Sequence, residues 1–173
     1  MSNQDLPSQT QIEALLDDLK SLMLATVQRD QTPLASYTPF ARSDDGASIW
    51  ILVSDLAGHA KNLARTGVCS VLIIRDESES AQVYIRERLQ YEMTATEIQR
   101  NTPAWNLGIN ALTSRQGALV ETLTTLSDFR LFSLQPDSGR YIVGFGQAYE
   151  LEKQTLAQIG HHLKGPTGPQ ISD

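Results

Sequence analysis

The sequence predicts a small, mainly antiparallel β-barrel with a few added helices. Six or more runs of strand length follow one another with short turns between them. Two of these runs, residues 48–53 and 68–74, are apolar apart from one serine in each, as expected where both faces of a strand are covered. Only one helical segment, residues 55–66, separates consecutive strands, so parallel βαβ winding is the weaker alternative.

The first half of the chain combines a helix with several strands and tight turns. Apolar residues from Ile12 to Met23 recur at three- and four-residue spacing and predict an amphipathic N-terminal helix. Pro39 cannot donate a hydrogen bond to a neighbouring strand, which indicates an edge or a bulge there. Gly46 suits the positive φ that the following turn needs. The strands expected here are residues 23–28, 34–41, 48–53 and 68–74, with a helix over residues 55–66.

The second half of the chain continues with strands and helices. Apolar and polar residues alternate over residues 82–98 and predict one long, half-exposed strand. Thr102 and Pro103 have the residue types of a helix cap and a first helical position, and a further helix is expected over residues 114–124. We also expect a hairpin of strands 129–134 and 140–145 across residues 136–139, and a last helix over residues 152–163. Residues 1–163 would form a single domain, followed by a flexible tail over residues 164–173.

Composition excludes several classes of partner. The 173 residues have a formal net charge of −6, a pI near 5.0 and no long basic run, so we expect no nucleic-acid partner. The N-terminal residues have neither a basic leader nor an apolar core, and no apolar run has spanning length, so we expect no membrane partner. The single cysteine, Cys69, can form no internal disulfide, which favours a reducing, cytoplasmic compartment.

The stretch VSDLAGHAKNLAR, residues 53–65, is the first candidate site. A helical projection places Lys61 and Asn62 on an exposed arc opposite the apolar residues, with His59 at the border. Ser54 is expected to cap this helix, whose first N–H groups have no partner inside the helix and could bind an anion. A capped amphipathic helix with solvated cations is the simpler alternative.

Several ordered motifs point to a known family. The segments SIWILVSDLA, SVLIIRDE, RERLQYE and GRYIVGFGQAYEL occur in this order and agree with the predicted strands. Over about residues 22–151 the chain resembles the haem-utilisation (HugZ/HutZ-like) branch of the FMN-binding split-barrel superfamily, which contains pyridoxamine 5′-phosphate oxidase. The resemblance implies an antiparallel split β-barrel that forms a homodimer, with a small, flat, anionic ligand in a groove built from both chains.

For FMN, the resemblance implies a phosphate site around residues 53–62. Flavin-binding members hold the phosphate there with arginine and lysine side chains, but Gly58 and His59 stand where such a basic pair is expected. A guanidinium grips phosphate with two hydrogen bonds, which neither residue can replace. The candidate cofactor-binding residues are Ser54, His59, Lys61, Asn62 and Arg88.

For haem, the resemblance implies an iron ligand near the C-terminus and an aspartate close to it. Asp128 stands at the position of that aspartate and would act through a hydrogen bond. Pro169 stands where the family has its histidine and cannot bind iron, so His161 or His162 is the substitute metal ligand that we consider. Two solvated histidines at the end of a helix are the simpler alternative. Arg88 could bind either a phosphate or the haem propionates, or could instead pair with nearby glutamates.

Three functions stay open at this point. The first is a haem-utilisation-type protein that binds haem at the dimer groove and, if it is an enzyme, degrades haem oxidatively. The second is an FMN-dependent oxidoreductase similar to pyridoxamine 5′-phosphate oxidase. The third is a non-enzymatic barrel that binds or sequesters a ligand, which Gly58 and Pro169 favour.

Overall fold

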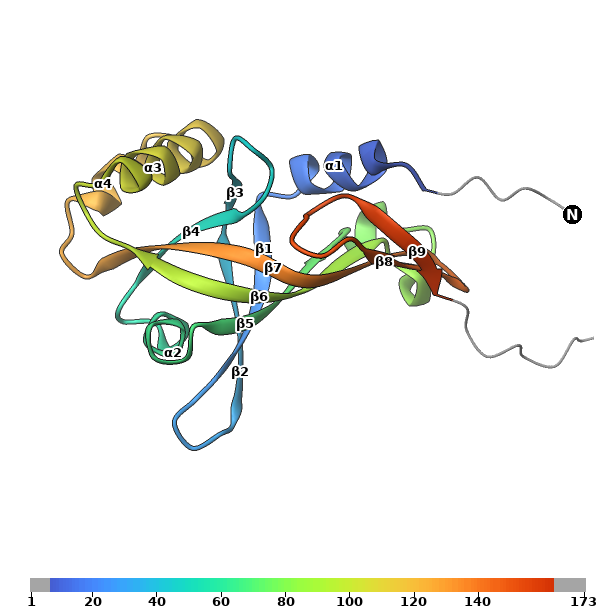
Figure 1. Cartoon of the computed structure of the whole chain (residues 1–173), viewed down its shortest axis with the longest axis horizontal. Helices are drawn as coiled ribbons and strands as arrows, with labels where there is room; N and C mark the ends of the chain where they lie inside the picture. The colour runs from blue at the N-terminus through green and yellow to red at the C-terminus, as the bar shows by residue number, and fades with distance from the viewer. Residues whose placement is uncertain (1–6, 164–173) are drawn as a thin grey trace, which may run out of the picture.

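The computed structural model describes residues 7–163, so the tail expected over residues 164–173 lies outside the described part of the chain. Nine strands form one sheet in which the described strand pairs are all antiparallel (Figure 1). The strands are β1 (Ser21–Val27), β2 (Pro33–Pro39), β3 (Ala41–Arg42), β4 (Ile49–Ser54), β5 (Val68–Ile74), β6 (Arg88–Ile98), β7 (Phe129–Gly144), β8 (Gln147–Leu151) and β9 (Ile159–Leu163). The helices are α1 (Gln9–Asp18), α2 (Gly58–Thr66), α3 (Pro103–Gln116) and α4 (Leu119–Thr124), with short 3-10 turns η1 (Glu77–Glu79) and η2 (Val83–Ile85).

The sheet closes on itself because β2 and β3 are one continuous piece of chain. The strand order is β2-β1-β5-β6-β7-β4-β3, and only Phe40 lies between β2 and β3. β2 therefore pairs with β1 at one end of this order while β3 pairs with β4 at the other. Pro39 is the last residue of β2 and the last to pair with β1, and it is followed by Phe40 and β3. The predicted mainly β, antiparallel barrel with helices is confirmed.

Two separate cores stabilise this arrangement. The first fills the barrel and includes Leu24, Ile51, Tyr91 and Phe132, all almost fully buried. The second lies between the outer face of β4 and β7 and the helices α3 and α4, where Trp50, Trp105 and Leu131 pack together. Gly108 on α3 permits this close approach, because a Cβ atom there would lie 2.9 Å from the Trp50 ring. The helices α3 and α4 therefore cover only one end of the sheet (Figure 1).

The expected hairpin of strands 129–134 and 140–145 is wrong, because β7 is one strand of 16 residues. Residues 136–138 form a β-bulge instead of a turn: Glu92 pairs with Ser138 and Met93 with Pro136, which leaves Asp137 as the extra residue. Proline, aspartate and glycine are typical of both bulges and turns, so residue types alone do not distinguish the two.

Three further expectations need correction. The strand over residues 82–98 begins only at Arg88, because residues 83–85 form η2 and the Arg86 guanidinium donates to the Arg75 carbonyl at 2.7 Å. The last helix over residues 152–163 is a turn followed by β9, which pairs with β8. The buried Tyr91 hydroxyl donates to the Leu156 carbonyl and holds that turn against the barrel. Finally, the helices expected near residues 103 and 114–124 divide at Gly117 into α3 and α4.

No helix within the described residues has both the length and the apolar character needed to cross a membrane.

Candidate functional site

Ser54 and Asp128 form the best-defined polar pair among the predicted site residues. Ser54 ends β4, Asp128 immediately precedes β7, and these two strands pair side by side. The Ser54 hydroxyl donates to Oδ2 of Asp128 at 2.6 Å, and the Asp128 carbonyl accepts from the Asp55 N–H at 2.8 Å. No hydrogen bond to Oδ1 of Asp128 is found within residues 7–163. One carboxylate oxygen is therefore available for a ligand.

Ser54 does not cap α2, contrary to the expectation. The cap residue is Ala57, and it makes no side-chain hydrogen bond. The Ser54 hydroxyl accepts from the Leu56 N–H at 3.1 Å and so belongs to the turn before the helix. Its hydroxyl proton is thereby committed to Asp128, which is a contact that local sequence patterns do not indicate.

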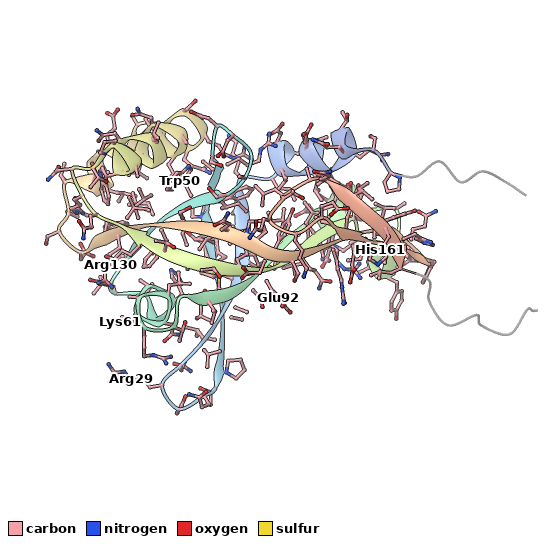
Figure 2. The ribbon with its side chains drawn as sticks, viewed as in Figure 1. Arg29, Trp50, Lys61, Glu92, Arg130 and His161 are labelled. Atoms are coloured by element: carbon pink, nitrogen blue, oxygen red, sulfur yellow. The ribbon has the colours of Figure 1, made fainter. Side chains whose placement is uncertain are left out.

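The inward face of α2 also differs from the helical projection. Asn62 is buried, and its amide donates to Oγ1 of Thr26 on β1 at 3.0 Å, so its expected place on the exposed arc is wrong. His59 lies on the same buried face, and burial lowers the pKa of its imidazole below the usual value. Lys61 is exposed as expected and remains available to an anion (Figure 2).

The other predicted residues lie at the opposite end of the sheet. Arg88, the first residue of β6, pairs with Ile142 near the end of β7 and makes no ion pair within the described residues. His161 and His162 are exposed on β9, and not at the end of a helix. Nε2 of His161 lies 3.0 Å from a Glu150 carboxylate oxygen, and Nε2 of His162 lies 2.9 Å from the Gly146 carbonyl.

One chain therefore holds the predicted residues in two separate sets. Asp128 precedes the first residue of β7, whereas Glu150, the partner of His161, pairs with Arg140 far along that strand. At about 3.3 Å per residue, the chain from Asp128 to Arg140 spans roughly 40 Å along the strand. Figure 2 places Lys61 and Arg130 at one end and His161 at the other. No single flat ligand can touch both sets of one chain.

A groove of about 510 Å³ runs across the outer face of the sheet between these two ends. Its floor is a cross-strand row of mostly small residues, Ala35, Ala25, Ser70, Glu92 and Ser138. Arg140 lines the groove beside Gln90, is exposed, and has no ion-pair partner among the described residues. Sequence patterns alone did not identify Arg140 as a candidate site residue. Arg140 alternates with buried residues along β7, and this alternation could have identified it as an outward-facing residue. The incorrect prediction of a turn over residues 136–139 obscured that pattern.

The fold and this groove define a split β-barrel protein, and comparisons with known proteins identify the family. The family model described as pyridoxamine 5′-phosphate oxidase matches residues 8–143, so the chain belongs to this family. It is 35% identical over 155 residues to heme oxygenase HutZ of Vibrio cholerae serotype O1, and the match spans 90% of this chain and 87% of the relative. The expected resemblance to the haem-utilisation branch is thereby confirmed.

Solved structures agree with this assignment. The crystal structure described as that of HutZ, the heme storage protein from Vibrio cholerae, superposes with a TM-score of 0.73 at 33% identity and covers 79% of this chain and 96% of its own. Campylobacter jejuni ChuZ superposes with a TM-score of 0.80 over 92% of this chain and 65% of its own. Its identity is 24%, so this second likeness supports the fold alone.

Proposed function

We propose that this protein binds haem between two copies of the chain and supports its oxidative opening. One observation carries the proposal: the candidate ligand residues fall into two sets at opposite ends of one sheet, so a second copy is needed to bring them together. The 35% identity to a protein named heme oxygenase supports the choice of ligand.

The groups present on this chain fit haem. Haem needs a donor for the iron and cationic partners for two propionates, and its iron supplies the oxygen chemistry. The exposed imidazoles of His161 or His162 would hold the iron. The guanidinium groups of Arg88 and Arg140, which make no ion pair within residues 7–163, would bind the propionates. The free Oδ1 of Asp128 would accept a hydrogen bond near the haem. These side chains would orient the haem and, in a groove covered by a second copy, exclude water.

A homodimer is part of this proposal. Exposed apolar residues follow the outer face of β1, β2 and β5 beside the groove, including Met23 and Tyr37, which are 50% and 70% exposed. Met23 pairs directly with Tyr37 on one side and Leu72 on the other, which forms a continuous apolar row. A second copy that covers this row would bury it and cover the groove. A cytoplasmic location also belongs to the proposal, supported by the free thiol of buried Cys69.

FMN is the second candidate, and the family model supports it. The first turn of α2 has no side-chain cap and keeps Lys61 exposed, which would suit a phosphate. However, Asn62 is committed to Thr26 and His59 is turned inward, which leaves one cation of the expected phosphate set on this helix. Haem is therefore the better supported ligand.

The decisive experiment is titration of the purified protein with haem and with FMN in parallel. We expect a saturable Soret band for haem and an increase in melting temperature, because a ligand that binds only the folded state stabilises it. Saturable binding of FMN but not of haem would overturn the proposal. If neither ligand raises the melting temperature, the non-enzymatic barrel becomes the better explanation.

Variants then test the individual roles. Replacing His161 and His162 together by alanine is expected to shift the Soret band and weaken haem binding. The matched control is His59→Gln, which changes the third histidine of the chain at a buried position on α2. An unchanged Soret band in the double variant would eliminate both histidines as iron ligands.

A further inference from the structure

Arg100 is an exposed cation that has no role in the proposed haem site, yet its guanidinium makes several hydrogen bonds to backbone carbonyls. Its Nη1 donates to the Thr124 carbonyl at 2.6 Å. Its Nη2 donates to the Leu126 carbonyl at 2.6 Å and to the Phe129 carbonyl at 2.8 Å. One guanidinium thus binds three carbonyl oxygens of a single connection.

These three carbonyls lie on both sides of Asp128. Thr124 is the last residue of α4, where backbone carbonyls have no partner inside the helix, and Phe129 is the first residue of β7. The connection between them, residues 125–128, contains Asp128 and has exposed residues before it. Fixing both ends of so short a segment restricts the positions that the Asp128 carboxylate can adopt.

The Arg100 guanidinium also stacks on an aromatic ring. Arg100 follows β6, and its Cζ lies 4.7 Å from the centre of the Trp105 ring, which belongs to the core between the sheet and α3. The next residue, Asn101, has a φ of +62°, so the chain turns sharply into α3 at this point. Stacking on a buried indole fixes the plane in which the arginine donates.

We propose that Arg100 is a positioning residue for Asp128. It holds residues 124–129 so that Oδ2 of Asp128 accepts from the Ser54 hydroxyl and Oδ1 faces the haem. The orientation of Oδ1 toward the haem rests on the proposed function. The planar fork of arginine is required, because three carbonyls in fixed directions demand several donors in one plane. Lysine keeps the charge but not this geometry.

The first test needs no haem. The Asp55 N–H donates to the Asp128 carbonyl at 2.8 Å, so its hydrogen exchange reports whether Asp128 stays in place. In Arg100→Lys we expect this amide to exchange about tenfold faster than in the wild type.

Arg115 offers a matched control. It also donates to three backbone carbonyls, those of Leu16, Asp17 and Leu19, and its Cζ lies 5.0 Å from the Phe40 ring centre. These three carbonyls lie in the last turn of α1 and directly after it, away from Asp128. Arg115→Lys therefore removes the same kind of contact and is expected to leave Asp55 exchange unchanged. Equally faster Asp55 exchange in both variants would indicate a general loss of stability and would overturn the proposal. Unchanged Asp55 exchange in Arg100→Lys would also overturn it.

The second test is a double-mutant cycle on haem affinity. Asp128→Asn is expected to weaken haem binding about tenfold, as is typical for partners that orient a metal ligand. Arg100→Lys should weaken it by that factor or less, and the double variant should match Asp128→Asn alone. Additive losses would refute the role through Asp128. If the wild type binds no haem, the proposed function fails, but Asp55 exchange still decides whether Arg100 holds Asp128.

Discussion

Single residues of α2 illustrate how burial changes the available chemistry. His59, Ala60, Asn62 and Leu63 are all buried, so the helix places two polar side chains against the barrel. The Asn62 amide is satisfied there by Thr26, whereas no hydrogen bond to the His59 imidazole is found in the part of the chain that the structure describes. A neutral imidazole tolerates this position better than a charged one.

The pKa of His59 leads to the first prediction. Because burial lowers this pKa, the folded state binds fewer protons than the unfolded state, whose imidazole keeps its ordinary pKa of 6.5. This contribution to stability is therefore present above the unfolded pKa and is lost as the pH falls below 6.5. Urea unfolding between about pH 7.5 and 5.5 should show a steeper loss in the wild type than in His59→Gln.

The control for this prediction is His162→Gln, which removes an exposed histidine and keeps His59. It is expected to lose stability with falling pH as the wild type does. A parallel pH dependence in the wild type and His59→Gln would contradict the prediction.

At the scale of elements, the bulge in β7 determines which side chains face the groove. Before the bulge Leu134 and Pro136 are buried, and beyond it Gly139 and Tyr141 are buried while Ser138 and Arg140 are exposed. The extra residue thus changes the alternation between the two halves of the strand. Gly139 is required there, because a Cβ atom would lie 2.9 Å from the Tyr91 ring.

Deleting Asp137 is therefore expected to destabilise the protein strongly. The deletion shifts one half of β7 by one residue and turns its buried side chains to the opposite face. We expect a loss of at least about 3 kcal/mol, or failure to fold, in chemical unfolding.

Asp137→Ser is the matched control because it keeps the bulge and changes only the contact with Thr94, whose hydroxyl donates to Asp137 at 2.9 Å. This exposed contact is expected to contribute about 1 kcal/mol or less. A deletion variant as stable as Asp137→Ser would refute the importance of the bulge.

At the scale of the whole molecule, the proposed dimer requires a face of the sheet that no helix covers. The helices α3 and α4 cover one end of the sheet (Figure 1). The outer face of β1, β2 and β5 carries the groove and the apolar row beside it. This uncovered face is the one that would form the proposed dimer.

Met23→Glu tests this inference, since it places a charge in the middle of the proposed interface. We expect light scattering to change from a dimer to a monomer and haem affinity to fall with it, because an unpaired buried charge is costly. The control is Leu107→Glu on α3, where the leucine is 57% exposed and lies outside the groove. A wild-type monomer, or a Met23→Glu dimer, would exclude this face.

Part of the site was predictable because it depends on local residue types and on family motifs. Asp128 was identified for haem, and Ser54 and Lys61 were identified for FMN. Nothing local indicates that Ser54 and Asp128 form a hydrogen bond with each other across 74 residues. Arg100 was missed for a related reason. Its three acceptors are backbone carbonyls, which have no signature in the side-chain sequence.

The sequence by itself determined the class of the fold, because hydrophobic runs and alternation depend on whether a strand is covered on one face or both. It also determined the start of α3, where Thr102 and Pro103 act locally. Only the tertiary structure decided that residues 129–144 form one bulged strand, that Asn62 points inward, and that Arg88 and the histidines lie far from Asp128. These features depend on which distant strand supplies the partner, and local periodicity carries no information about that choice.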